Sequence, residues 1–304
     1  MRQRFFLMEN PAAGIARSRL VDDVVRTLEQ QGAAVTRARA SDIAAAREKA
    51  RAASVGGSYE AIVAAGGDGT IRQIATALVG SEAALGIIPV GTGNVLAHEI
   101  GLVRTPAAVA RMLREGPVVK VACAQANGEP FLLMVGVGFD ARVVAALDQR
   151  LKSRLGKAAY AGPLLSAVVR PADRLTVEVD GHHHSASWAV IANACHYGGG
   201  FMLAPRTGIR ERGLQAVLFK THSRAVFLGQ LMGLLASGRL EPRSGRGSEV
   251  EMLSCARVRI TAPHAVPAQV DGDVFGVTPV EIDAGSREVR LIVPEHQRVA
   301  KGRE

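Results

Sequence analysis

Hydrophobic positions in the first third of the chain alternate between two spacings. Short, continuous apolar runs are typical of buried strands, whereas Leu20, Val21, Val24, Val25 and Leu28 repeat with helical spacing. The expected strands are 4–9, 33–39, 61–65 and 85–90, and the expected helices are 18–32, 41–53 and 71–78. This alternation predicts a parallel sheet covered by helices, that is, an α/β domain.

After about residue 116 the pattern changes to strand-like segments joined by turn dipeptides. Asn127-Gly128, Asp180-Gly181 and Asp271-Gly272 each separate two apolar runs, which predicts hairpins. We therefore expect an α/β plus β protein. Residues 1–116 would form the parallel-sheet domain, and 117–304 a mostly antiparallel, β-sandwich-like domain, with the last strand a candidate to return to the first domain.

Composition limits the class of protein. Apolar residues make up 48% of the 304 residues and charged residues 21%, which excludes a disordered chain. The net charge of +9 favours an anionic partner such as phosphate, nucleic acid or a membrane surface, although a general bias toward arginine would give the same number. We expect no nucleic-acid partner, because aromatics are only 4% and no binding motif is present.

Cysteine usage and apolar run lengths predict a cytoplasmic protein. The three cysteines lie far apart and form no C-x-x-C pair, which argues against a disulfide framework or a zinc site. The longest strongly apolar stretch without charge is 225–238, too short for the ~20 residues that span a bilayer.

The sharpest motif is Gly66-Gly67-Asp68-Gly69-Thr70, which leaves a buried strand and enters a helix. Glycines allow a tight turn and close approach of a phosphate, and N–H groups at a helix start favour an anion. Thr70 could donate to phosphate, and Asp68 could meet it through Mg²⁺. The alternative is a glycine-rich turn in which Asp68 only caps a helix.

Two further loops follow predicted strands and would lie at the same carboxyl edge of the sheet, where open α/β sheets bind ligands. Together the three loops predict a nucleotide site, and Ser41 at the end of the second strand could approach it. The candidate contacts in these loops are Asn10, Pro11 and Gly14 in the first and Gly91, Thr92 and Asn94 in the other.

These motifs resemble the soluble diacylglycerol kinase and sphingosine kinase superfamily of lipid kinases, especially its bacterial members. The resemblance rests on NPAAG, GGDGT, PVGTGN, GVGFDA at 136–141, YGGGFMLAP at 197–205 and QVDGD at 269–273. It implies an ATP- and Mg²⁺-dependent enzyme that transfers the γ-phosphate to a lipid hydroxyl in a cleft between two domains. It also implies a lipid substrate and contact with an anionic membrane surface; edge strands would allow a homodimer.

The resemblance implies that Asp271 is the base that takes the proton from the attacking hydroxyl. Asp273 would help by raising the pKa of that carboxylate. Without the resemblance, an ordinary Asp-Gly turn explains the same residues. GVGFDA imitates a dinucleotide fingerprint, but no suitable strand follows it, so a helix that packs closely on glycines is the favoured interpretation.

Three positions depart from the family pattern. Val95 replaces an aspartate, Asp273 replaces a glutamate, and Arg212 occupies the place of an acid that helps to hold a structural Mg²⁺. A guanidinium cannot ligate a cation, so we expect the structural metal near Arg212 to be absent. An NAD kinase-like enzyme, or a nucleotide- or lipid-binding regulator with impaired catalysis, remain as alternatives.

Two segments are candidates for a lipid-facing surface. One is the basic segment after GVGFDA, and the other is the apolar stretch 223–239, which could instead be a helix packed on the β domain. His182, His183 and His184 are expected at an exposed hairpin turn and not at a metal. The basic residues are Arg142, Arg150, Lys152, Arg154 and Lys157.

Overall fold

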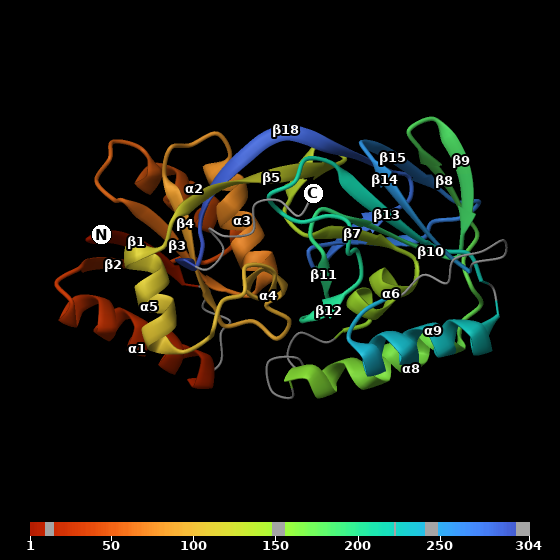
Figure 1. The fold of residues 1–304 in the computed structure, drawn as a ribbon, viewed down its shortest axis with the longest axis horizontal. Coiled ribbons are helices and arrows are strands. Elements are labelled where there is room, and N and C mark those ends of the chain that lie inside the picture. The colour runs from red at the N-terminus through yellow and green to blue at the C-terminus, as the bar shows by residue number, and fades with distance from the viewer. Residues whose placement is uncertain (10–14, 148–155, 222, 241–248, 296–304) are drawn as a thin grey trace. The chain divides into compact units, whose positions relative to one another are not determined.

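A computed structural model describes residues 1–9, 15–147, 156–221, 223–240 and 249–295 (Figure 1). The chain divides into two compact units, one of residues 1–121 with 287–304 and the other of residues 122–286. Both expected classes are found: a parallel α/β unit and a mostly antiparallel β-sandwich.

The first unit is built on parallel strands in the order β2-β1-β3-β4. Every residue of β3 and β4 is buried, which explains their unbroken apolar sequence. Helix α1 packs against α5, and α2 packs against α3 (Figure 1). The elements are β1 (Arg4–Glu9), α1 (Ile15–Gln30), β2 (Ala34–Arg39), α2 (Ile43–Ser54), β3 (Ala61–Gly66), α3 (Asp68–Leu78), β4 (Ala84–Pro89), α4 (Val95–Glu99) and α5 (Pro106–Glu115).

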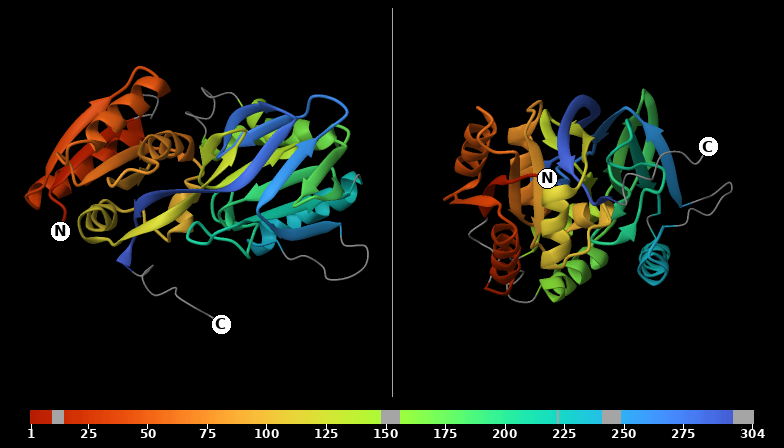
Figure 2. Two further views of the ribbon diagram at one scale, coloured as in Figure 1. Left: turned by 90° about the horizontal axis from the view of Figure 1, so that it is seen from above. Right: turned by 60° about the vertical axis from the view of Figure 1, so that its left-hand side comes forward.

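Two long strands, β5 (Val118–Ala126) and β18 (Val280–Ile292), pair with one another and cross the boundary between the units (Figure 2). Within the first unit, Leu291 pairs in parallel with Leu85 of β4. Within the second unit, the N–H of Asn127 donates to the carbonyl of Glu281.

The second unit contains two sheets around one apolar core. One sheet has the antiparallel order β14-β13-β10-β7-β16-β17, and the other joins β18, β15, β8 and β9. Alternate residues of both sheets, such as Ile191 and Ile260, are fully buried in this core. The strands of the first sheet are β7 (Met134–Val137), β10 (Trp188–Ala192), β13 (Leu214–Phe219), β14 (Val250–Cys255), β16 (Pro267–Val270) and β17 (Asp273–Val277). The remaining strands are β6 (Glu129–Phe131), β8 (Leu175–Val179), β9 (His182–Ala186), β11 (His196–Tyr197), β12 (Phe201–Met202) and β15 (Arg257–Thr261).

Three helices cover the other face of the β7–β10–β16 sheet. They are α6 (Phe139–Ala145), α8 (Ala161–Val169), which follows a 3₁₀ turn at Gly156–Tyr160, and α9 (Arg224–Ser237). Trp188 stands on that face, where its ring lies 5.4 Å from the ring of Phe139 and 5.8 Å from that of Phe227. The sequence analysis favoured a helix after GVGFDA and offered one at 223–239, and α6 and α9 lie at these places.

Candidate functional site

The first glycine motif is a very short turn followed directly by a helix. Strand β3 ends at Gly66 and α3 begins at Asp68, so Gly67 alone separates them. The sequence analysis began this helix at residue 71 and was wrong by one turn. Asp68, Gly69 and Thr70 therefore form the first helical turn, and Gly67, the N-cap residue, has no side chain with which to cap α3.

The two glycine loops pack backbone to backbone because β3 and β4 are neighbours. A Cβ atom at Gly91 would lie 2.6 Å from the Cα of Gly67, and one at Gly66 would lie 2.4 Å from the Cβ of Thr70. Both distances are shorter than any real carbon contact. Glycine is required at these two positions for packing inside the protein, whatever ligand the loops hold.

Asp68 joins the two loops by capping α4. Its Oδ2 accepts the N–H of Val95 at 3.0 Å, and its Oδ1 accepts the N–H of Leu96 at 3.1 Å. The carboxylate thus stabilises the positive end of α4, the helix that follows the second loop and not the helix that Asp68 itself begins.

Asn94 shapes the second loop. It adopts a left-handed backbone (φ 49°), and its side chain is buried. Its Oδ1 accepts the N–H of Gly91 at 2.7 Å, while its Nδ2 donates to the carbonyl of Gly91 at 2.8 Å. Asn94 therefore closes the loop on itself, and Thr92 lies between these two residues, half-buried.

Ser41 lies farther along the sheet edge. It follows β2, which β1 separates from β3, and strands are about 4.8 Å apart, so two spacings amount to about 10 Å. Its exposed hydroxyl donates to Asp42, whose carboxylate caps α2 and whose pKa is lowered, mainly by the N–H of Ala45. Asn10, Pro11 and Gly14 lie outside the described residues.

In the second unit, Asp271 occupies the expected hairpin turn. Val270 pairs with Asp273, which leaves a two-residue turn with positive φ at Asp271 (50°) and Gly272 (86°). Such turns favour Asp-Gly because both residues must be left-handed. Asp273 begins β17 and is half-buried.

The carboxylate of Asp271 is a buried structural anchor. It accepts backbone N–H groups from Leu132 at 3.0 Å, Leu133 at 2.9 Å and Met134 at 2.9 Å. Residues 132 and 133 lie between β6 and β7, which belong to different sheets, so Asp271 secures the point where the chain changes sheet. The apolar run after Asn127-Gly128 therefore forms two strands, β6 and β7, and not a single arm of a hairpin.

A second buried carboxylate, Asp140, lies at the start of α6. Trp188 Nε1 and the N–H of Ala141 donate to its Oδ1 at 2.9 and 2.8 Å, and Gln269 Nε2 donates to its Oδ2 at 3.0 Å. Burial raises the pKa of Asp140 to about 6, although these hydrogen bonds oppose the shift. Burial and the nearby Asp140 raise the pKa of Tyr197 well above its usual value. The sequence analysis quoted GVGFDA but did not single out Asp140, because the raised pKa of this residue results from burial, which the motif does not show.

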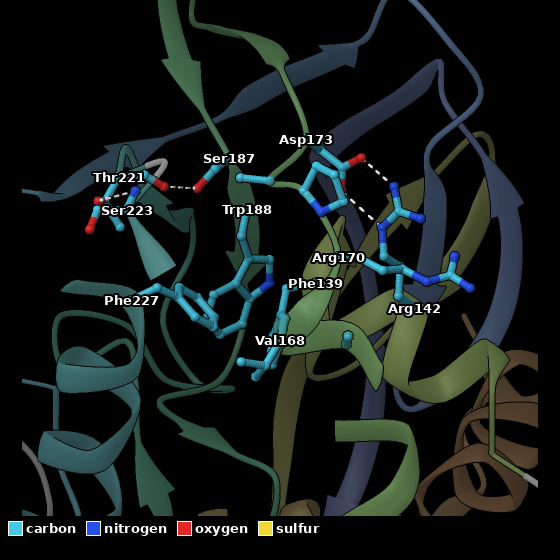
Figure 3. A pocket seen from close by; sticks show the side chains of 13 residues that line it. Phe139, Arg142, Val168, Arg170, Asp173, Ser187, Trp188, Thr221, Ser223 and Phe227 are labelled. Carbon is cyan, nitrogen blue, oxygen red and sulfur yellow. Dashed lines mark hydrogen bonds and ion pairs between the residues drawn. The ribbon is translucent and has the colours of Figure 1, made fainter. Parts of the chain in front are cut away.

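A pocket opens beside this cluster, between α6, the segment after α8, β10 and α9 (Figure 3). Its floor is aromatic, with Phe139, Trp188 and Phe227 in contact. Ser187 lies buried at its side, where its hydroxyl donates to the carbonyl oxygens of Phe219 and Thr221.

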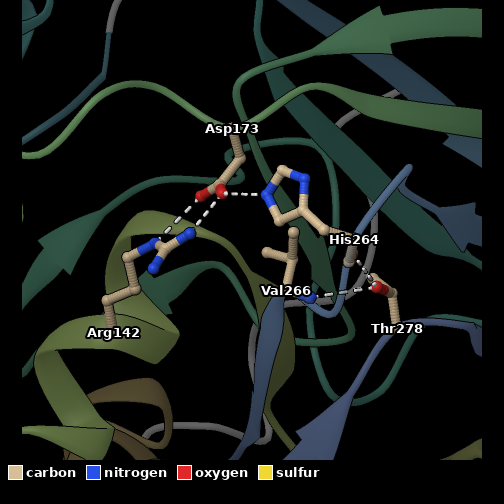
Figure 4. A network of polar contacts seen from close by, with 5 residues as sticks. All are labelled: Arg142, Asp173, His264, Val266 and Thr278. Atoms are coloured by element: carbon tan, nitrogen blue, oxygen red, sulfur yellow. Dashed lines mark hydrogen bonds and ion pairs between the residues drawn. The ribbon is translucent and has the colours of Figure 1, made fainter.

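An ion pair flanks the pocket (Figure 4). Arg142 donates from Nε to Asp173 Oδ2 at 3.0 Å and pairs through Nη2 with the other carboxylate oxygen, while His264 Nε2 lies 3.5 Å from that oxygen. The guanidinium of Arg142 thus binds a buried carboxylate at the side of the pocket, and its contact with lipid stays a prediction. Arg150, Lys152 and Arg154 lie outside the described residues, and nothing is described for the side chain of Lys157.

Two other expectations concern the histidine triplet 182–184 and Arg212. His182 and His183 are exposed after the Asp180-Gly181 turn, as expected, and His184 Nδ1 lies 3.1 Å from Glu251. Arg212 is exposed before β13, and the absence of a structural metal there stays a prediction.

Family comparisons cover both units. Residues 4–126 match a diacylglycerol kinase catalytic domain, and residues 133–299 match a YegS C-terminal NAD kinase beta sandwich-like domain. The chain is 31% identical to "Probable lipid kinase YegS-like" of Klebsiella pneumoniae over 70% of this chain and 71% of that protein.

Two further comparisons are with a curated protein and with a solved structure. An uncharacterized protein of Synechocystis is 30% identical over 77% of this chain, which spans only 54% of that longer relative. A crystal structure of a diacylglycerol kinase from Bacillus anthracis shares the fold, with a TM-score of 0.71, 17% identity, and coverage of 96% of this chain and 97% of that one. The matched domains and the Klebsiella relative show that this chain belongs to the family of YegS-like lipid kinases, with a diacylglycerol kinase catalytic domain.

Proposed function

We propose that this protein is an ATP-dependent lipid kinase that transfers the γ-phosphate to a lipid hydroxyl. The observation that carries the proposal is the paired glycine loops at the carboxyl edge of β3 and β4, joined by Asp68. Family membership supports the reaction class, and the position of the loops at this edge supports a nucleotide site.

The start of α3 is the proposed phosphate site. The N-cap residue of α3 is Gly67, which has no side chain to cap the helix, whereas Asp68 caps the first N–H groups of α4. Phosphate oxygens would accept from the first turn of α3, with the hydroxyls of Thr70 and Thr92 as further donors.

The described residues fit Mg²⁺ that arrives on the nucleotide. Mg²⁺ usually keeps several waters and binds through substrate phosphates with one or two carboxylates. The carboxylate of Asp68 lies at the start of α4, where each oxygen accepts one backbone N–H, and carboxylate oxygens are ligands that Mg²⁺ accepts. Bound Mg²⁺ would neutralise phosphate charge, and Asp68 would be its carboxylate.

Asp271 is the proposed base for the acceptor hydroxyl, with Asp273 beside it in the same hairpin. Three backbone N–H groups hold the Asp271 carboxylate in one place, which suits a reaction that depends mainly on positioning. We propose the aromatic pocket over Trp188 as a site for the lipid chain.

We also propose that α8 and α9 meet an anionic membrane surface. Leu165 and Met232 are 66% and 60% exposed, and Val169 and Leu235 are 57% and 47% exposed. Neither helix contains an acidic residue, and exposed Arg170 and Arg239 follow their ends. Apolar side chains with basic neighbours and no acid are typical of interfacial helices. No helix in the described part of the chain is long and apolar enough to cross a membrane.

A transfer assay with radiolabelled ATP tests the kinase. The acceptors are diacylglycerol, monoacylglycerol, phosphatidylglycerol, ceramide, sphingoid bases and NAD, each with and without Mg²⁺. We expect Mg²⁺-dependent labelling of at least one lipid, and loss of about 100-fold or more in kcat for Asp271→Asn. The matched control is Asp283→Asn, an exposed carboxylate of β18, which should keep its activity.

Other outcomes would reject the proposal. Labelling of NAD alone would identify an NAD kinase. ATP binding without transfer to any acceptor would identify a regulator. Near wild-type kcat for Asp271→Asn would remove Asp271 as the base.

A further inference from the structure

Strand pairing sets Asp140 and Gln269 side by side. Gln269 of β16 lies opposite Gly136 of β7, so the two positions share a sheet face. A Cβ atom at Gly136 would lie 1.9 Å from Oδ2 of Asp140, so the carboxylate occupies the place of the missing side chain. All four groups involved, including Trp188, lie within the second unit.

The hydrogen bonds fix the orientation of the Gln269 amide. The N–H of Gly272 donates to Oε1 of Gln269 at 2.8 Å, so the amide nitrogen must face Asp140, 3.0 Å away. Trp188 Nε1 and Ala141 N donate to the other oxygen of Asp140. Gly272 therefore donates to Gln269, and Gln269 donates to Asp140.

We propose that Asp140 and Gln269 are positioning residues that hold the Asp271-Gly272 turn in its working orientation. The inference rests on the proposed function of Asp271 as the base. Neither side chain is assigned to a substrate, because both are buried (4% and 3% exposed) and are bonded to other protein groups.

The side chain and the backbone of the Asp271-Gly272 turn are held by different groups. The carboxylate of Asp271 is held by the N–H groups of residues 132–134, and its backbone has the left-handed φ of 50° that only Gly, Asn and Asp adopt readily. The bond from Gly272 to Gln269 holds the backbone side. A shift of about 1 Å in a reacting group can cost about 100-fold in rate, so this second support matters for catalysis.

An exchange of partners tests the idea. Asp140→Asn puts an amide nitrogen against the nitrogen of Gln269, and a flip of Gln269 would then turn its nitrogen toward Gly272. Gln269→Glu puts two carboxylates together. The double variant Asp140→Asn with Gln269→Glu restores every pair, because the introduced asparagine amide donates to the introduced glutamate, and that glutamate still accepts from Gly272. It also keeps the net charge.

Five proteins would be compared: the wild type, both single variants, the double variant, and Asp283→Asn as the control for charge loss. Hydrogen exchange of the Gly272 amide reports the turn, and kcat and KM for lipid and ATP report catalysis. We expect each single variant to exchange Gly272 at least tenfold faster and to lose about 10- to 100-fold in kcat, with KM for ATP within twofold. The double variant should recover both to within about threefold. Circular dichroism verifies that each variant is folded, because Trp188 donates to Asp140 and its fluorescence would change with that contact.

The outcomes separate this inference from the kinase proposal. Unchanged Gly272 exchange in both single variants, or a double variant no better than the singles, would overturn the positioning role. If the wild type labels no acceptor, the kinase proposal fails, and Gly272 exchange alone still decides whether Asp140 and Gln269 hold the turn.

Discussion

Asp68 Oδ2 accepts the backbone N–H of Val95 at 3.0 Å, which ties the first glycine loop to the helix after the second. Val95 is the position where related kinases usually carry an aspartate. Its buried side chain offers no charge, but its N–H still binds the carboxylate of the GGDGT motif. Asp68 therefore stabilises α4, so a substitution of Asp68 that lowers activity must also be tested for loss of stability.

Asp68→Ala should destabilise the first unit by about 1–2 kcal/mol, because α4 loses its cap and two N–H groups lose their acceptor. Hydrogen exchange should show faster exchange at Val95 and Leu96, and urea unfolding followed by circular dichroism should show the lower stability. Glu29→Ala, which removes an exposed acid of α1, is the control for loss of an acid in the same unit. Unchanged protection of both amides would contradict the capping role.

Gly91→Ala should destabilise the first unit by about 1–3 kcal/mol and weaken ATP binding. The new methyl would lie 2.6 Å from the backbone of Gly67, and backbone cannot move aside as a flexible side chain can. Thermal unfolding and nucleotide titration measure the two effects. Gly162→Ala is the matched control, because its Cβ meets nothing within 4 Å, and that variant should be neutral or slightly more stable. Equal stability of the two variants would contradict the prediction, because it would mean that the Gly67 and Gly91 loops can move apart without loss of stability.

Asp271→Ala should lower the free energy of unfolding of the second unit by at least about 3 kcal/mol. Three buried N–H groups at residues 132–134 would lose their acceptor, and each unsatisfied donor costs about 1–3 kcal/mol. Asp271→Asn retains one carbonyl acceptor and should cost less. Urea unfolding followed by Trp188 fluorescence measures both variants, and equal stability of Asp271→Ala and the wild type would rule out the anchoring role.

The stability of the second unit should fall as pH rises from about 4 to about 6. Burial raises the pKa of Asp140 to about 6 from 3.8, so in this window the folded protein keeps a proton that the unfolded chain has released. The unfolding free energy should decrease by about 3 kcal/mol across the window and then become flat above it.

The difference between the wild type and Asp140→Asn isolates this contribution from other titrating groups. Trp188 donates to the Asp140 carboxylate, so its fluorescence should also change with a midpoint near pH 6 in the wild type only. The same pH dependence in both proteins would assign the titration to another group.

Leu165→Glu and Met232→Glu should each reduce recovery with vesicles that contain phosphatidylglycerol, by about tenfold in a flotation assay. Each change replaces an exposed apolar contact by a charge that anionic lipid repels. Val55→Glu, at a 70% exposed valine of the first unit, is the control and should float like the wild type. Equal recovery with neutral and anionic vesicles would overturn the electrostatic part of the proposal.

The sequence by itself determined the two-part architecture and the glycine loops. Continuous apolar runs became the fully buried strands β3 and β4. The pairs Asn127-Gly128, Asp180-Gly181 and Asp271-Gly272 became the turns that their backbone preference favours. These features are local, because apolar spacing and turn geometry depend on residues close in the chain. The family motifs came from the same local stretches.

Only the tertiary structure decided what the acids contact. Asp68 caps a helix that begins 27 residues later, a contact that the motif did not predict, while Asp271 binds N–H groups more than 130 residues earlier. No sequence pattern marked Asp140, because its raised pKa depends on burial among α6, β10 and β16. Hydrogen bonds and desolvation act between atoms that the fold brings together, so spacing along the chain could name these residues but could not assign their partners.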